Sequence, residues 1–192
     1  MSRLMLPLAV FGLLVCSVVS AEEQTKKKAA KGLKAGDSIG AFYVTKVAGA
    51  EDDGVEQGEQ LCYRCKYGSR PMVMVFARDT GGKLNELVKE IDAAVKANED
   101  AELKGFVTLM GEDASALKDT AAKVAQTSGA TSVPVVIAKD NVTGPSNYKI
   151  DENAAITVVL ANDSKVIAAR KFNKAEKVNV AGVMKVVNKM LN

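Results

Sequence analysis

The residues in this chain best suited to chemistry are two cysteines three positions apart, Cys62 and Cys65. A Cys-x-x-Cys pair can form a disulfide, exchange it with another thiol, or offer two thiolates to a soft metal ion such as copper(I). Neighbouring basic residues favour the thiolate form, whereas Gly68 and Pro71 leave no room for a long helix after the pair. The sequence leaves three alternatives open: a structural disulfide, a redox-active or metal-carrying dithiol, and two thiols without a role.

The chain contains no histidine. This excludes a Ser-His or Cys-His nucleophile, an imidazole base, histidine-ligated zinc or copper, and a Cys-x-x-Cys-His haem attachment. Two thiolates alone are too few for a closed tetrahedral zinc site, and no methionine cluster lies beside them to favour copper. We therefore predict neither a bound metal nor a cofactor.

Residues 1–21 have the composition of a cleavable export signal. Arg3 precedes an apolar run over residues 4–19, and Val19 and Ala21 provide small side chains at the −3 and −1 positions of a cleavage site. The run is shorter than the roughly 20 residues that span a bilayer, although a retained anchor is the alternative. We predict a protein of the periplasm or cell envelope, or a secreted one, with no membrane span after cleavage.

Cleavage would remove Cys16, the third cysteine, and would leave Cys62 and Cys65 in an oxidising compartment where they pair with each other. Residues 22–35 are rich in lysine and alanine and are predicted to form a basic linker. Of 26 basic and 23 acidic residues only Arg3 lies in the predicted signal, so the rest is nearly neutral. We therefore expect no nucleic-acid partner.

The elements that position the cysteine pair follow from the apolar pattern. Residues 71–77 form a continuous apolar run, typical of a strand buried on both faces. Three- and four-residue spacing of apolar side chains predicts the helices, and residues 162–165 predict a hairpin turn. The strands are expected at residues 41–47, 61–70, 71–77, 106–110, 133–138, 156–160 and 166–169; helices are expected after Leu84, Asp113 and Asn173. This order predicts one α/β domain over residues 36–192, with a mixed sheet and helices on both faces.

Four segments of the chain resemble a known family, and one of them, residues 156–172, looks like its penultimate hairpin. Ala35-Gly36-Asp37-Ser38-Ile39-Gly40-Ala41-Phe42 is similar to the opening of the peroxiredoxin-like branch (alkyl hydroperoxide reductase and thiol-specific antioxidant) of the thioredoxin-like superfamily. Residues 71–77 resemble its central strand, and residues 133–140 the strand that this branch adds to plain thioredoxin. The resemblance implies a thioredoxin-like three-layer sandwich with an N-terminal β-hairpin extension.

The chain departs from that family at the reactive position. Family members carry the nucleophilic cysteine after the central strand, where a helix begins and its unpaired N–H groups stabilise a thiolate. Residues 78–83 of this chain read Arg-Asp-Thr-Gly-Gly-Lys, and only Thr80 is a weak stand-in. The chain is therefore not a standard peroxiredoxin.

Our interpretation is a thioredoxin-fold protein that acts as a non-enzymatic or weakly redox-active binding module for an unknown protein or thiol partner. One alternative is a thiol–disulfide oxidoreductase whose catalytic residues are a relocated Cys62 and Cys65. A weaker alternative is a soft-metal carrier.

Overall fold

The apolar run after Pro71 forms β3 (Met72–Ala77), whose six residues are all buried. The structure is a computed structural model that describes residues 32–192, so the predicted signal and most of the predicted linker lie outside the described residues. β3 is parallel to β4 on one side and antiparallel to β6 on the other. Both neighbours use its backbone groups, and both of its faces are covered.

Seven strands form one mixed sheet in the order β2-β1-β5-β4-β3-β6-β7. β1 is antiparallel to β2 and to β5, with Val44 opposite Leu61 and Ala138. β6 and β7 form the antiparallel hairpin that the sequence predicts. The remaining strands are β1 (Val44–Ala48), β2 (Gln60–Leu61), β4 (Lys104–Leu109), β5 (Val135–Ala138), β6 (Ile156–Asn162) and β7 (Lys165–Phe172).

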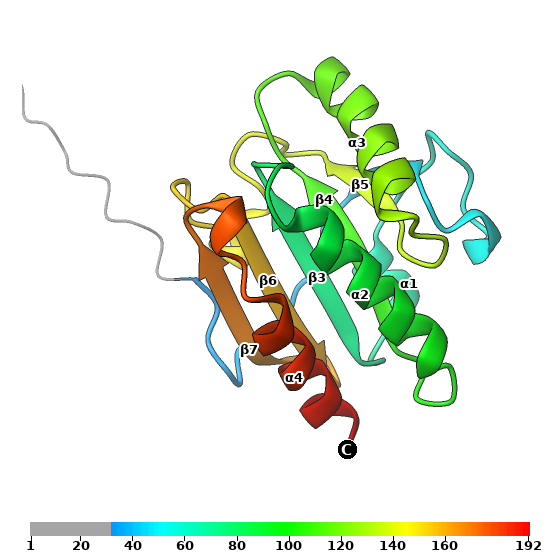
Figure 1. Ribbon diagram of the computed structural model, residues 1–192, viewed down its shortest axis with the longest axis vertical. Helices are drawn as coiled ribbons and strands as arrows, with labels where there is room; N and C mark the ends of the chain where they lie inside the picture. The colour runs from blue at the N-terminus through cyan, green and yellow to red at the C-terminus, as the bar shows by residue number, and fades with distance from the viewer. Residues whose placement is uncertain (1–31) are drawn as a thin grey trace, which may run out of the picture.

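Each face of the sheet has its own apolar core. Val73 and Val75 of β3 pack in the core that the three long helices cover, whereas Met72 and Met74 face the opposite side and pack with Tyr63 of the short helix. The long helices lie side by side across one face (Figure 1). The helices are α1 (Tyr63–Tyr67), α2 (Leu84–Ala97), α3 (Ala114–Ser128) and α4 (Val180–Leu191). The predicted mixed α/β sheet with helices on both faces is confirmed.

Two predicted elements were wrong in detail. The strand expected over residues 61–70 is a two-residue strand followed by α1, because the buried pair Tyr63 and Tyr67 follows helical spacing. The last helix begins at Val180 rather than after Asn173, because Asn179 supplies the cap: its side chain accepts a hydrogen bond from the Gly182 amide at 2.8 Å.

The buried β3 strand generates a stability prediction. We expect Val75→Asp to cost at least about 3–5 kcal/mol, the range for an uncompensated buried charge. Val142→Asp is the matched control, because Val142 is 47% exposed, and it should change stability by less than about 0.5 kcal/mol. Urea unfolding followed by circular dichroism measures both. Equal stability of the two variants would show that β3 tolerates a charge and that its core is not closed.

Candidate functional site

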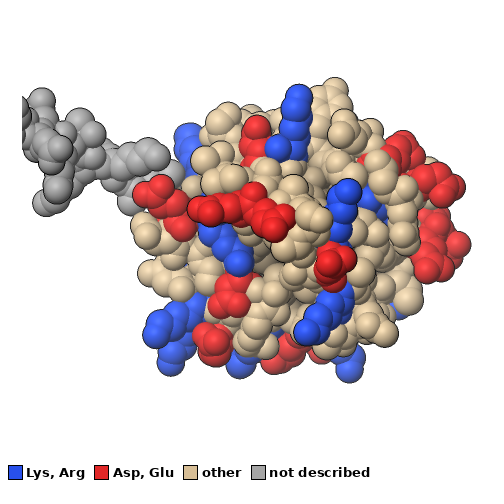
Figure 2. Space-filling view, turned by 90° about the horizontal axis from the view of Figure 1, so that it is seen from above, with Lys and Arg blue, Asp and Glu red and all other residues tan. Residues whose placement is uncertain are grey.

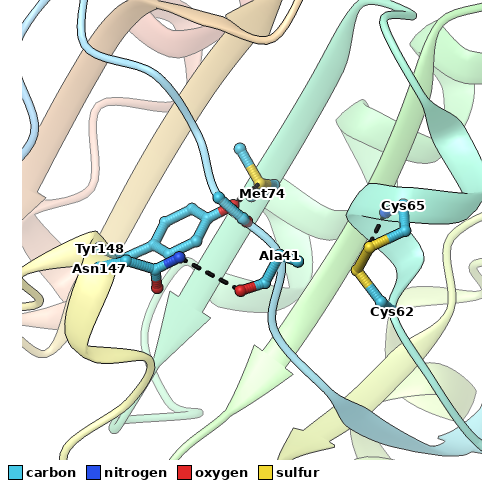
Figure 3. Close-up of a disulfide and its surroundings, with 7 residues drawn as sticks. Ala41, Cys62, Cys65, Met74, Asn147 and Tyr148 are labelled. Carbon is cyan, nitrogen blue, oxygen red and sulfur yellow. Dashed lines mark hydrogen bonds between the residues drawn. A yellow bond between two sulfur atoms is a disulfide. The ribbon is translucent and has the colours of Figure 1, made fainter.

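Cys62 and Cys65 are joined by a disulfide in the turn that opens α1 (Figure 3). Their Cα atoms are 5.1 Å apart. Cys62 caps the helix, and its Sγ accepts a hydrogen bond from the backbone N–H of Cys65 at 3.1 Å. The intramolecular pairing expected from the sequence is thus present, and the motif opens a helix rather than a strand.

The two sulfur-bearing residues differ in accessibility. Cys62 is 8% exposed, whereas Cys65 is exposed to solvent. An incoming thiolate would therefore reach Cys65 first, and Cys62 would be the leaving group. The amide hydrogen bond to Cys62 Sγ would stabilise the negative charge that gathers there as the bond breaks.

Two tyrosines on α1 hold the disulfide turn against the sheet. The rings of Tyr63 and Tyr67 lie 5.8 and 6.1 Å from the ring of Phe106 on β4. Tyr63 also donates its hydroxyl to Asp53 Oδ2 at 2.6 Å. Both tyrosines are packing residues of the core on this face of the sheet.

A buried lysine organises the loop beside α1. Lys46 on β1 is 2% exposed, and its ammonium donates to the Ala50 and Val55 carbonyls at 2.7 and 2.8 Å and to Asp53 Oδ1 at 2.7 Å. The ammonium therefore has three acceptors, as its geometry allows. Lys46 therefore connects the loop to β1, and Asp53 connects the same loop to Tyr63 on α1.

This network is not evident from the sequence, because an acidic run such as residues 51–53 is typical of a solvated loop. Glu51 and Asp52 are exposed, but Asp53 turns inward to Lys46 and Tyr63. Acidic side chains do gather at the end of the molecule that carries this loop (Figures 1 and 2). One feature of the sequence does indicate the network: Lys46 lies among inward-facing apolar residues, and the acidic Asp53 follows it seven positions later.

Burial controls the protonation of the site tyrosines. Burial is the largest cause that raises the pKa of Tyr63 and of Tyr67 well above the ordinary range, and the nearby Asp53 carboxylate adds to it in both. Burial also raises the pKa of Tyr148, against the opposing charge of Arg64. All three phenols stay neutral in the folded protein at physiological pH.

A cleft of about 670 Å³ opens beside α1. Lys66, the residue after Cys65, lines it together with Tyr67 and Arg70. Arg70 Nε pairs with Glu102 Oε1 at 2.8 Å across the cleft, and Lys104 lines the far wall. The cleft thus has charges of both signs and borders the C-terminal part of α1, and its lining residues include neither cysteine.

The segment after β3, where the family that the sequence resembles carries its reactive cysteine, holds no cysteine in this chain. Residues 78–83 connect β3 to α2, and Asp79 Oδ1 accepts the Gly81 amide at 2.9 Å. Arg78 donates to the Val142 carbonyl. The cysteine pair precedes β3 in the chain and this position follows it, so the two lie in different connections of the sheet.

Solved structures share this architecture over most of the chain. A protein described as a thiol:disulfide interchange protein DsbE from Chlorobium tepidum superposes with a TM-score of 0.59 at 12% identity, covering 83% of this chain and 99% of its own. The thioredoxin domain of a Bacteroides vulgatus thiol-disulfide oxidoreductase gives 0.57 at 12%, with the same coverages. AhpC from Mycobacterium tuberculosis gives 0.57 at 11%, again covering 83% and 99%.

The chain has a thioredoxin-like fold. No protein-family model and no curated protein matches the sequence. At these identities the likeness concerns the fold, and the roles of Cys62 and Cys65 must be argued from their own geometry.

Within residues 32–192, no group of three or more acidic, cysteine or histidine side chains is arranged to hold a metal ion. Within the same residues, no helix combines the length and apolar character that a membrane crossing requires. A copper-carrying role would in addition require the Cys62–Cys65 disulfide to be reduced first.

The raised pKa values of Tyr63, Tyr67 and Tyr148 generate a prediction for alkaline solution. A pKa raised by folding contributes stability that is fully present below the unfolded value, about 10 for tyrosine, and is lost as pH rises beyond it. We expect tyrosinate absorbance from the three buried residues to appear in one step with loss of near-ultraviolet circular dichroism, above about pH 10. A gradual absorbance rise from these residues in the still-folded protein would contradict it.

The Lys46 network generates a second prediction. Lys46→Met keeps the length of the side chain but leaves Asp53 and two carbonyls without their cation, so we expect a loss of about 3–5 kcal/mol in the free energy of unfolding. Lys89→Met, an exposed change on α2, is the matched control and should stay within about 0.5 kcal/mol. Guanidinium unfolding measures both. Equal small losses would show that the buried ammonium is dispensable.

Proposed function

We propose that this protein carries out thiol–disulfide exchange through Cys62 and Cys65, in a site relocated to α1 of the thioredoxin-like fold. The observation that carries the proposal is the unequal pair: an exposed Cys65, and a shielded Cys62 whose Sγ accepts the Cys65 amide at 3.1 Å. Exchange requires one accessible sulfur and one stabilised leaving sulfur. The names of the first two fold neighbours, a thiol:disulfide interchange protein and a thiol-disulfide oxidoreductase, support the same chemistry.

The exchange proceeds in two displacements. A thiolate of a dithiol partner attacks Cys65 Sγ, the Cys62–Cys65 bond breaks, and Cys62 leaves as a thiolate. The partner's second thiolate then attacks the partner sulfur of the mixed disulfide and releases Cys65. Two electrons pass from the partner to the pair, the partner gains a disulfide, and its two protons go to the released thiolates or to solvent.

The same geometry serves the reverse direction. Reduced Cys65, which is exposed, attacks a partner disulfide, and Cys62 resolves the mixed disulfide from within the same turn. The accessible cysteine is the second of the pair in the chain. The cleft beside Lys66 and Arg70 would hold the partner during either exchange.

This proposal favours the thiol–disulfide oxidoreductase, which the sequence left as an alternative, over a purely non-enzymatic binding module. The non-enzymatic interpretation depends on the missing cysteine at residues 78–83. If Cys62 and Cys65 exchange disulfides instead, the missing cysteine no longer argues against a redox function. We also place the exchange outside the cytoplasm, because residues 1–21 have the sequence of an export signal and an oxidising compartment suits the reaction.

The test measures reactivity cysteine by cysteine. Cys62→Ala leaves the exposed Cys65 thiol, and we expect it to react with a disulfide reagent at least about tenfold faster than Cys65→Ala, which leaves the shielded thiol. Rates with 5,5′-dithiobis(2-nitrobenzoate) in native buffer measure this. The wild-type disulfide should also be reduced by dithiothreitol while circular dichroism stays native.

The double variant Cys62→Ala/Cys65→Ala is the inactive control. It should remain folded, because a disulfide that closes so short a loop removes less denatured-state entropy than the roughly 3 kcal/mol of a 15-residue loop. If the disulfide were reduced only after global unfolding, or if Cys62 reacted as fast as Cys65, the pair would be structural and the proposal would fail.

A further inference from the structure

A groove separate from the disulfide lies on the opposite side of the β6–β7 hairpin from α4. Its volume is about 470 Å³, within the roughly 300–1,000 Å³ of small-molecule sites. Val159 of β6 and Ala169 of β7 lie on its floor, and two loop segments flank it, residues 32–34 and residues 148–151. Tyr148, which is labelled in Figure 3, forms part of the wall. Its hydroxyl donates to the Gly40 carbonyl at 2.9 Å, and this hydrogen bond fixes the ring.

The groove has a polar end and an apolar end. Thr157 and Lys171 face each other across β6 and β7, and Val159 and Ala169 form the next cross-strand pair on the same face. Side chains that are two residues apart on a strand lie about 6.6–6.8 Å apart. A ligand along the hairpin would therefore meet a hydroxyl and an ammonium first, and an apolar floor next.

The hydroxyl at the polar end has no partner. Thr157 Oγ1 is buried and makes no hydrogen bond in the structure. A buried hydroxyl that is left unpaired is unfavourable, because it has lost its hydrogen bonds to water. A ligand oxygen at this end of the groove would accept its proton and remove that cost.

The charges around the groove favour an anion. Its lining includes four basic residues and one acidic residue, Asp151. Asp151 is already held by Lys171 Nζ at 2.6 Å and by the Asn153 amide at 2.9 Å. Lys34 and Lys149 are exposed and form no salt bridge within residues 32–192. The lining residues therefore carry a net positive charge, and the ammonium groups of Lys34 and Lys149 are available to an anionic ligand.

The same features argue against two other occupants. Residues 22–31, which precede the groove wall in the chain, contain four lysines and two glutamates, so they would add positive charge to a positive groove. An acidic peptide would bring backbone N–H and C=O groups onto a floor of Val159 and Ala169, where they would stay unpaired. A hydrocarbon chain with one carboxylate meets neither obstacle.

We propose that this groove binds a medium-chain fatty acid. The carboxylate lies at the polar end, beside the unpaired ammonium of Lys149, and accepts the hydrogen bond of Thr157. The hydrocarbon chain lies along Val159 and Ala169. This binding is independent of exchange at Cys62 and Cys65, so either can fail without the other.

Decanoate, kept below its critical micelle concentration, is the probe for the full-length chain. Titration followed by ¹H–¹⁵N spectra should give saturable shifts at residues 149–151, 157–159 and 169–171. Decanol, with the same tail and no charge, should bind at least about tenfold more weakly, because a charge-assisted hydrogen bond contributes about 1.5–3 kcal/mol. Absence of saturable shifts in the groove, or equal binding of decanoate and decanol, would overturn the proposal.

Variants locate the binding. Thr157→Val and Lys149→Gln should each weaken decanoate several-fold, and Ala169→Leu, which fills the floor, should abolish the groove shifts. Lys104→Gln, a lysine beside the α1 cleft, is the matched control and should leave affinity unchanged. Unshifted amides elsewhere show that each variant is folded. Unaltered affinity in Ala169→Leu and Thr157→Val would place the ligand outside this groove and contradict the proposal.

Discussion

The ammonium of Lys46 ties together three segments on the side of the sheet that carries the disulfide. A cation taken out of water is costly unless its hydrogen bonds are replaced, and here two loop carbonyls and the Asp53 carboxylate replace them. Asp53 then holds the Tyr63 hydroxyl, so α1 is connected to β1 by a continuous polar chain as well as by packing. Such a buried pair adds little to stability compared with an apolar substitute. Its contribution is position: the loop and the disulfide turn are held in one arrangement.

That arrangement explains how a thioredoxin-like fold can carry its cysteine pair away from the start of α2. At the usual position a long helix presents several unpaired N–H groups to the sulfur. The five-residue α1 offers less, and the structure shows one N–H, from Cys65, on Cys62 Sγ. The anchoring by Tyr63, Asp53 and Lys46 keeps that one donor in place, because a turn this short has little rigidity of its own. A fixed donor and an exposed partner sulfur are the requirements that the site does meet.

The sequence predicted the parts of the fold that repeat a pattern. The run over residues 71–77 fills the cores on both faces of the sheet, and the helical spacing from Leu84 to Val95 fills one of them, so each pattern involves many apolar side chains and is strong. The helix α1 was missed because five residues contain only one helical repeat, Tyr63 to Tyr67. The cysteine pair was found from spacing alone, but its unequal exposure depends on packing across the sheet. The inward turn of Asp53 could not be predicted either, because it depends on Lys46 facing the interior, and a single charged residue in a strand usually faces water.

A row of aromatic rings fixes how the disulfide turn and the fatty-acid groove lie relative to each other. Tyr63 stacks on Phe106, Phe106 packs on Phe42, and Phe42 packs on Tyr148, with ring centroids 5.8, 5.9 and 4.9 Å apart. These separations lie within the preferred range for aromatic pairs, about 4.5–7 Å. The row begins under α1 and ends at the groove wall.

Coupling between two sites requires an element with two arrangements that each site favours differently. The rings of this row are close-packed between the Lys46 network at one end and Tyr148 at the other. Because the Tyr148 hydroxyl is bonded to the Gly40 carbonyl, the row has one arrangement. The row therefore acts as a rigid support that lets each site work alone, which is why chemistry at the cysteines and binding at the hairpin can be separated by experiment.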